Sequence, residues 1–535
     1  MQRRKFLKST AIVSAPLFFN KIPVMAAENL QTENLQIMAN AASECGKILV
    51  IIQLSGGCDG LSLVAPRDKW AELTAARSNI LINENQVLRL DNNDTTGLHP
   101  ATPEFQNLYN EGKMMIVQGV SYPNPSYSHF RAIDIWFSGV DSNQISPTGW
   151  IGRALNSIYP DYPAAYPNPT MRDPLAVQIG SGLSFSLQGP SVNMGYSSTN
   201  PDDLLNVINA TSDPAPDSDY GAELTFLRLM KDQSNAYRSV LQNAYNTPVS
   251  APVTYPDNSL AEQLKIVARL INGGLKTPVY IVNHPRGFDT HGNQVSDSDK
   301  TKGELPRNLA ILSEAVSAFQ NDLRNMGKED KVTGMTHSEF GRRVVSNDSR
   351  GTDHGTAAPV LFFGAALNTS PSAVAGTAHP IPGMIGTSPD LPANATVDDE
   401  VPMQFDYRQV YSSIMQDWLC MSEAQATAAL GRPYAKLPIF ASTQLSTPKF
   451  DNSSFLTIYP NPVSNNQINI KFATYLNDNI AVAVYNIQGV KVFDSKFVVN
   501  GSTLNFSINN RLSSGTYILE VITNGARHTE KLLIL

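Results

Sequence analysis

The chain has 535 residues, enough for roughly two to four domains with hydrophobic cores of their own. Its formal net charge of −7 is spread without long blocks of like charge, so nothing indicates a nucleic-acid partner or an anionic membrane surface. The three cysteines, Cys45, Cys58 and Cys420, are too few for a disulfide framework. Cys45 and Cys420 could pair or remain buried thiols. Cys58 could be a ligand or a nucleophile, although a small residue filling a tight turn is the simpler interpretation.

The N-terminal segment has the three parts of an export signal. Basic residues at 3–8 (RRKFLK) precede a short apolar stretch at 11–19 and a small-residue cleavage site at 24–26. The paired arginines indicate the twin-arginine translocase, which carries folded proteins; the alternative is a basic start to an ordinary core helix. The apolar stretch is too short to cross a membrane, so we expect no transmembrane segment. We expect residues 1–26 to be a signal peptide and 27–44 a polar leader.

Residues 45–435 alternate between apolar runs and amphipathic segments. Near-continuous apolar runs, typical of strands buried on both faces, lie at 47–54, 114–120, 277–282 and 331–336. Helical periodicity is clear at 223–245, 260–272 and 309–326, with a further candidate at 406–419. Segments rich in turn-forming residues, such as 91–100, are expected to be insertions. The pattern predicts a doubly wound α/β domain with a mostly parallel sheet and helices on both faces.

Ionisable and hydroxyl side chains cluster just past the ends of these apolar runs. They are Asp59, Ser128, His129, Asp289, His291, His337, Glu339, Asp353 and His354. In open α/β sheets, ligands bind in the crevice outside the carboxyl ends of the strands. We therefore expect these side chains to meet at one edge of one sheet, as in a hydrolytic metal site.

Asp289 and His291 are the strongest candidates for metal ligands. They are two residues apart, so an extended backbone points both to the same side. Asp353 and His354 repeat the pairing of carboxylate and imidazole. Such oxygen and nitrogen donors suit one or two divalent ions, with zinc, calcium and magnesium as the candidates. The alternative for either pair alone is a solvated loop.

Glu339 and Arg342 lie between these two pairs in the sequence. Glu339 could complete a coordination sphere, and Arg342 offers a forked cation for an anionic substrate. The alternative is a helix capped by Ser338 and followed by surface residues. His337 could be a ligand, a partner of a ligand or a packed histidine.

Ser128 and His129 follow the run at 114–120 and are candidates for direct roles in catalysis. A serine at a strand-to-helix turn can act as a nucleophile, and His129 could move a proton or stabilise charge; Ser128 could equally be a helix cap. Asp59, in a glycine-rich turn, suits a metal-binding carboxylate. No G-x-S-x-G motif surrounds Ser128, and the chain has no dinucleotide fingerprint, so a serine-esterase triad and a nucleotide cofactor are not expected.

After a proline-rich linker at 436–454, residues 455–535 show short alternating strands separated by turn signals, which predicts a small β-sandwich. The segments YPNPVSNNQINI, VYNIQGVKVF and LSSGTYILEVITNG resemble the C-terminal sorting domain of the Bacteroidetes type IX (Por) secretion system. This resemblance implies the type IX machinery as a partner and export through the periplasm to the cell surface or medium. The alternative is a carbohydrate-binding sandwich, but the tail has no tryptophan.

A second resemblance covers nearly all of 45–435. LSGGCDGL, YSHFRAIDIW, TGWIGR, FDTHGNQ, HSEFGRR and TDHGTAAPVLFFG, in this order, resemble the exported bacterial family called domain of unknown function 1501. That family is grouped with the alkaline phosphatase and sulfatase-like superfamily, which implies an alkaline phosphatase-like fold with one or two divalent metals. The implied metal ligands are Asp59, Asp289, His291, Glu339 and His354, and the implied nucleophile is Ser128. The Asp–His spacing of two, the Ser-Glu dipeptide at 338–339 and the missing sulfatase C-x-P-S-R motif depart from the superfamily pattern.

Together these features predict an exported, metal-dependent hydrolase-like protein that acts on phosphate or sulfate esters, with a small anionic ester or a polysaccharide as substrate. In this hypothesis Ser128 attacks, while Arg342 and His129 stabilise charge or shuttle a proton. The competing hypothesis is a non-catalytic surface or polymer-binding protein that retains the fold.

Overall fold

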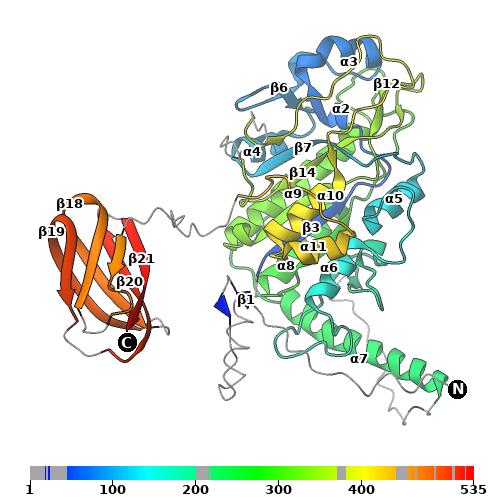
Figure 1. Cartoon of the computed structure of the whole chain (residues 1–535). Helices are drawn as coiled ribbons and strands as arrows, with labels where there is room; N and C mark the ends of the chain where they lie inside the picture. The colour runs from blue at the N-terminus through cyan, green and yellow to red at the C-terminus, as the bar shows by residue number, and fades with distance from the viewer. Residues whose placement is uncertain are drawn as a thin grey trace. The chain divides into compact units, whose positions relative to one another are not determined.

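A computed structural model describes residues 18–19, 22–23, 45–199, 215, 218–369, 381–441, 456–463, 467–486, 490–508, 512–523 and 526–534. By internal contacts the chain divides into two compact units, residues 1–442 and 443–535 (Figure 1). The predicted signal peptide, the polar leader and most of the linker lie outside the described residues, except for strands β1 (Phe18–Phe19) and β2 (Ile22–Pro23), which pair with each other. Within the described part of the chain, no helix combines the length and apolar character needed to cross a membrane.

The N-terminal unit is built on a nine-stranded sheet with the order β15-β7-β14-β11-β3-β10-β8-β9, and β16 pairs with β7. The strands are β3 (Ile48–Gln53), β7 (Met114–Ser121), β8 (Ala176–Ile179), β9 (Tyr196–Ser198), β10 (Val279–Asn283), β11 (Val332–His337), β14 (Ala358–Phe363), β15 (Met384–Ile385) and β16 (Phe405–Asp406). Only β14 runs antiparallel to its neighbours, β11 and β7. The predicted mostly parallel sheet is therefore confirmed.

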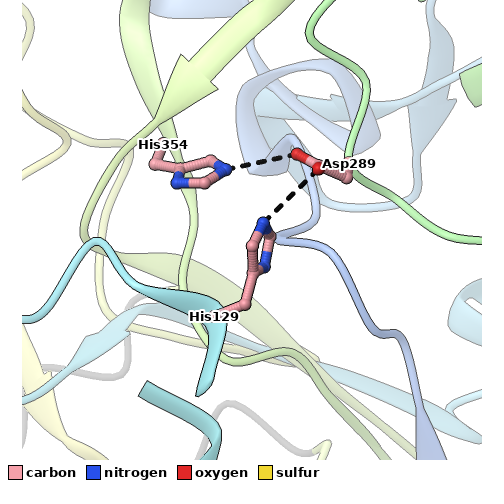
Figure 2. Close-up of side chains that lie close together, drawn as sticks. All are labelled: His129, Asp289 and His354. Carbon is pink, nitrogen blue, oxygen red and sulfur yellow. Dashed lines mark hydrogen bonds and ion pairs between the residues drawn. The ribbon is translucent and has the colours of Figure 1, made fainter. Parts of the chain in front are cut away.

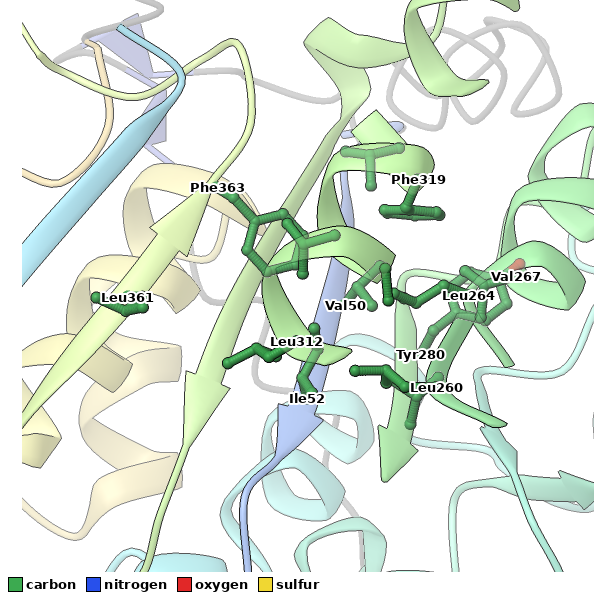
Figure 3. Packing of buried hydrophobic residues seen from close by; sticks show 14 of the residues in the cluster. Val50, Ile52, Leu260, Leu264, Val267, Tyr280, Leu312, Phe319, Leu361 and Phe363 are labelled. Carbon is green, nitrogen blue, oxygen red and sulfur yellow. The ribbon is translucent and has the colours of Figure 1, made fainter. Parts of the chain in front are cut away.

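Helices cover both faces of this sheet, because alternate residues of each strand pack on opposite sides. Val50 and Ile52 of β3 belong to one core with α4 (Pro103–Asn110), α8 (Ser259–Asn272) and α9 (Glu304–Asn325) (Figure 3). Leu49 and Ile51 belong to a second core with α5 (His129–Ser138), α6 (Trp150–Ile158), α10 (Tyr407–Ser413), the π-helical turn η6 (Ile414–Trp418) and α11 (Glu423–Leu430). The long helix α7 (Asp219–Tyr245) contributes to both cores. This confirms the doubly wound α/β prediction.

The four apolar runs singled out in the sequence become β3, β7, β10 and β11. These strands point the same way, so their carboxyl ends meet at one edge of the sheet. Asp353 and His354 reach this edge differently, from a two-stranded hairpin of β12 (Arg342–Ser346) and β13 (Thr352–His354). Ser338 is not a helix cap, because a turn leads directly from β11 into β12.

A small three-stranded sheet lies N-terminal to α4. It consists of β4 (Val64–Pro66), β5 (Leu88–Leu90) and β6 (Asn93–Leu98), with β6 in the middle. The segment 91–100, expected to be an insertion, contains β6 and lies in this small sheet, outside the main one. The remaining short helices here are α2 (Gly60–Leu63), η1 (Arg67–Lys69), α3 (Trp70–Arg77) and η2 (Glu84–Gln86), while η3 (Phe185–Leu187) and η5 (Glu329–Lys331) lie further along the chain.

Cys45 and Cys420 form a disulfide with Cα atoms 5.8 Å apart and 375 positions apart in the sequence. Cys45 lies just before β3 and Cys420 just after η6, so the bond closes the N-terminal unit near both of its ends. Of the two states left open by the sequence, the structure has the paired one. Cys58 is a free, buried thiol.

The C-terminal unit is an antiparallel β domain of five strands with a core of its own. The strands are β17 (Leu456–Tyr459), β18 (Gln467–Asn486), β19 (Lys491–Ser507), β20 (Gly515–Thr523) and β21 (Ala526–Ile534). The short strands expected from the sequence at 467–472 and 480–485 merge into β18, and those expected at 491–493 and 503–508 merge into β19. The pairing of β18 with β19 changes register between Lys471 and Leu476, which is where the alternation of the sequence is interrupted.

Candidate metal centre

Four side chains from three separate segments converge at the carboxyl edge of the main sheet. His129 is the first residue of α5, Asp289 and His291 follow β10, and His354 ends β13. The ligand atoms of His129, Asp289 and His354 all lie within 4.8 Å of one another (Figure 2). His291 joins them, with its Nε2 atom 2.9 Å from Nε2 of His354 and 3.1 Å from Oδ1 of Asp289.

The spacing of these atoms suits coordination of one ion. Nε2 of His354 lies 3.2 Å from Oδ1 of Asp289, which closes a triangle with the two distances to His291. Two ligands that bind zinc at about 2.0–2.1 Å in tetrahedral geometry are about 3.3 Å apart. Nε2 of His129 lies 3.4 Å from the other oxygen of Asp289. The atoms are therefore close enough to hold one metal ion.

The rings of His291 and His354 are oriented by oxygen acceptors on their far sides. Nδ1 of His354 donates to the backbone oxygen of Tyr127 at 2.7 Å, and Nδ1 of His291 donates to Oδ1 of Asp353 at 3.0 Å. Because each Nδ1 carries the proton, each Nε2 is left with a lone pair. Two imidazole lone pairs and a carboxylate oxygen thus face one another, an arrangement that a cation between them stabilises.

His129 follows the same rule through a buried carboxylate. Its Nδ1 donates to Oε1 of Glu339 at 2.8 Å, and the same oxygen accepts the backbone N–H of Gly56 at 2.7 Å. Only 1% of the Glu339 surface is exposed. The structure places Glu339 and Asp353 behind the imidazoles, where they fix ring orientation, rather than beside the other ligand atoms.

Arg342 is buried beneath Asp289 and is not open to a substrate. Its guanidinium donates to Oδ1 of Asp289 at 2.6 Å and to the backbone oxygen of Thr352 at 2.8 Å. Its other bonds go to the backbone oxygens of Gly56, Gly57 and Phe288. Burial raises the pKa of Asp289, but the hydrogen bond and charge of Arg342 outweigh it and hold that pKa below its usual value. The arginine favours the ionised form of this carboxyl group.

Asp59 is fully buried and lies outside the histidine cluster. Both of its oxygens accept from Arg77 (2.9 and 3.0 Å), and Oδ2 also accepts from Ser62 at 2.6 Å and Gln294 at 2.7 Å. Burial raises the pKa of Asp59, yet the charge of Arg77 and these hydrogen bonds bring it below the ordinary value. Asp59, expected to bind metal, thus has its carboxylate hydrogen-bonded to donors from this chain.

The other candidates take varied positions. Ser128 is exposed and directly precedes His129; it occupies the N-cap position of α5 without a side-chain capping bond. His337 is buried against Trp136, and burial lowers its pKa to about 4, which marks it as a packed neutral histidine. Burial and the charge of Asp59 raise the pKa of the Cys58 thiol, which argues against a thiolate nucleophile.

The glycine turn after β3 packs against the segment that carries Asp289. Gly56 has φ +115°, and a Cβ at this position would lie 2.4 Å from the backbone nitrogen of Asp289. A side chain there would displace both Asp289 and the N–H that binds Glu339. The glycines singled out in the sequence thus serve close backbone approach.

Sequence reasoning missed Arg77, Gln294 and the Tyr127 carbonyl, and it treated His129 as a proton shuttle. Arg77 lies 18 positions from Asp59 on α3, and no local pattern marks it as a buried partner. The only available signal for His129 was its place at a strand-to-helix turn beside the other clusters.

Comparison with family models gives two matches. The model of a family described as protein of unknown function (DUF1501) matches residues 237–422, and that of a secretion system C-terminal sorting domain matches residues 457–535. No curated protein matches the chain.

Solved structures with a similar arrangement include two enzyme-superfamily members. One is a protein in the alkaline phosphatase superfamily from Vibrio parahaemolyticus, with 9% identity, TM-score 0.31, and coverage of 83% of this chain and 81% of that one. Another is the PsFucS1 sulfatase from Pseudoalteromonas sp., with 10% identity, TM-score 0.30, and coverage of 92% and 88%. A third is PorZ, a surface component of the type IX secretion system of Porphyromonas gingivalis. This match has 16% identity and TM-score 0.13, and it covers 18% of this chain and 13% of PorZ.

The sorting domain implies type IX secretion to the cell surface or the medium. The chain thus matches the DUF1501 model over part of its doubly wound α/β unit and the model of a secretion system C-terminal sorting domain over its antiparallel β unit.

Proposed function

We propose that this protein is an exported, metal-dependent hydrolase whose single divalent ion is held by His129, Asp289, His291 and His354. The observation that carries the proposal is the convergence of three imidazole nitrogens on one carboxylate, each imidazole held from behind by an oxygen acceptor. Three imidazoles favour an ion of the zinc class over calcium or magnesium, which prefer oxygen ligands.

The chain's own residues would perform the remaining tasks. A bound ion would supply a Lewis acid for an ester oxygen. Ser128, exposed at the start of α5 and next to a ligand, is proposed as the nucleophile. The half-exposed side chains of Asp289 and His291 (45% and 46%) leave the centre accessible to a substrate from solvent. Phosphate and sulfate esters remain the proposed substrates.

One observation favours the non-catalytic alternative. The donor groups of Arg342 are taken up by Asp289 and by backbone oxygens, so this arginine does not supply the cation expected for an anionic ester. In that case the same ion would be structural, or would bind a surface polymer.

Metal analysis of the purified full-length protein tests the proposal. We expect about one zinc-class ion per chain, lost in His291→Ala and in His129→Ala, and retained in His528→Ala, a control on β21 of the C-terminal unit. Ser128→Ala should keep the ion and lose hydrolysis of phosphomonoesters, phosphodiesters or aryl sulfates. A wild-type protein without stoichiometric metal contradicts the metal centre. A metal-loaded protein inactive on every ester supports the non-catalytic alternative.

A further inference from the structure

A fully buried polar network lies directly behind the candidate metal centre, and Gln294 is its hub. None of the surface of Asp59, Arg77, Thr290, Gln294 or Thr352 is exposed. Burying this much polar surface costs free energy unless each group is hydrogen-bonded. The hydrogen bonds therefore indicate which segments the network holds together.

The carboxamide of Gln294 joins the two segments that carry the proposed ligands. Its Oε1 accepts the hydroxyl of Thr290 at 2.9 Å and that of Thr352 at 2.9 Å. Thr290 stands between Asp289 and His291, and Thr352 precedes Asp353 and His354. The backbone repeats the link, because the N–H of Thr352 donates to the oxygen of Thr290 at 3.0 Å. One acceptor atom therefore ties the segment after β10 to the hairpin of β12 and β13.

Asp59 and Arg77 determine which way this amide points. Nε2 of Gln294 donates to Oδ2 of Asp59 at 2.7 Å, and Arg77 pairs with the same carboxylate. A flipped amide would set its oxygen against an anion, so the orientation with Oε1 toward the two threonines is fixed. Arg77 also donates to the backbone oxygens of Val344 and Arg343 on β12, which anchors the hairpin to the same network.

We propose that Gln294 is a positioning residue that sets the separation of His291 and His354, with Asp59 and Arg77 as its orienting pair. The two Nε2 atoms are 2.9 Å apart, but His291 follows β10 of the main sheet whereas His354 lies on the separate β12–β13 hairpin. A link between these two segments is therefore needed to hold that distance. Ligand positions must be held to about 0.5 Å for tight coordination. This inference rests on the proposed metal centre.

Cobalt titration of the full-length protein, followed by visible absorption, tests this role, because the spectrum of bound Co²⁺ reports coordination geometry. Gln294→Met keeps the side-chain size and removes all four hydrogen bonds of the carboxamide, including a long one of 3.5 Å from Nε2 to the hydroxyl of Ser62. We expect it to weaken Co²⁺ binding about 10-fold or more and to change the spectrum, as loss of a supporting shell does elsewhere. Gln320→Met is the matched control: Gln320 is 1% exposed, lies on α9, and its amide has no hydrogen-bond partner among the described residues, so binding and spectrum should stay unchanged.

A second pair of variants separates positioning from general stability. Gln294→Glu places two carboxylates against each other at Asp59 and should weaken binding as well. Adding Asp59→Asn leaves one carboxylate and one amide at this contact, as in the wild type but with the two groups exchanged. The double variant should recover part of the Co²⁺ affinity and of the wild-type spectrum.

The outcomes are distinguishable. If the wild type binds no Co²⁺, the metal centre and the role of Gln294 both fall. If the wild type binds but Gln294→Met keeps affinity and spectrum, only the role of Gln294 falls. Thr290→Val and Thr352→Val, which each remove one hydroxyl, should give smaller losses of the same kind even if Gln294→Met fails to fold.

Discussion

Glu339 and Asp353 allow a test of how burial scales the influence of a carboxylate on a metal-binding histidine. Each accepts the Nδ1 proton of one imidazole, from His129 and His291 respectively. The Asp353 side chain is 55% exposed, whereas that of Glu339 is 2% exposed. The substitutions Glu339→Gln and Asp353→Asn keep an acceptor oxygen and remove only the charge.

The size of each effect follows from the dielectric surroundings. Losing such an outer partner costs about 10–100-fold in metal affinity, or about 1.4–2.7 kcal/mol. A unit charge acts about four times more strongly at an effective dielectric constant of about 20 than in water at about 80. We therefore expect Glu339→Gln to lie near 100-fold and Asp353→Asn at 10-fold or below.

Competition with a metal-binding dye, on full-length protein at fixed pH and ionic strength, measures both affinities. Raising the salt concentration should reduce the effect of Asp353→Asn further and leave that of Glu339→Gln nearly unchanged. Thermal unfolding of the metal-free variants controls for loss of fold. Equal effects of the two substitutions, or a larger one at Asp353, would refute the reasoning, since then burial would not govern the contribution of these charges.

Three further outcomes are expected. Burial lowers the pKa of His99 and of His337 to about 4. The folded state therefore binds fewer protons than the unfolded state between about pH 6.5 and 4, and the free energy of unfolding should fall by about 3 kcal/mol per histidine as the pH drops through this range. In urea unfolding, His337→Phe should show a flatter dependence of this free energy on pH. Reduction of the Cys45–Cys420 disulfide, or Cys420→Ser, should cost up to about 5 kcal/mol because the bond closes a loop of 375 positions, and an unchanged urea midpoint after reduction would contradict this. Gly56→Ala should lower metal content without loss of the fold, measured by metal analysis beside circular dichroism, because its Cβ would meet the backbone of Asp289.

The sequence predicted the main sheet well because its strands are continuous apolar runs. In an α/β chain, such a run fits few structures other than a strand buried on both faces. Period-two spacing also led to the expectation that Asp289 and His291 share a side, and their atoms do meet at His354. The ion pair of Asp59 with Arg77 was not predicted, because arginine is usually a surface residue and its burial here depends on tertiary packing alone. Likewise, whether Glu339 contacts an ion or an imidazole depends on about 3 Å of placement, roughly the span of one hydrogen bond, which residue spacing does not encode.

The Cys45–Cys420 bond determines which part of the N-terminal unit a pulling force can unfold. The bond joins Cys45, just before β3, to Cys420, just after η6, so a pull applied to the chain before Cys45 and after Cys420 passes through the bridge and bypasses the sheet. Only the chain beyond Cys420, including α11, can then be drawn out under load. In a force-extension experiment the oxidised protein should release a short contour length from the N-terminal unit, corresponding to that segment alone. Under reducing conditions the whole sheet comes under tension, and the additional release should approach about 3.4 Å for each of the 375 positions that the bond encloses.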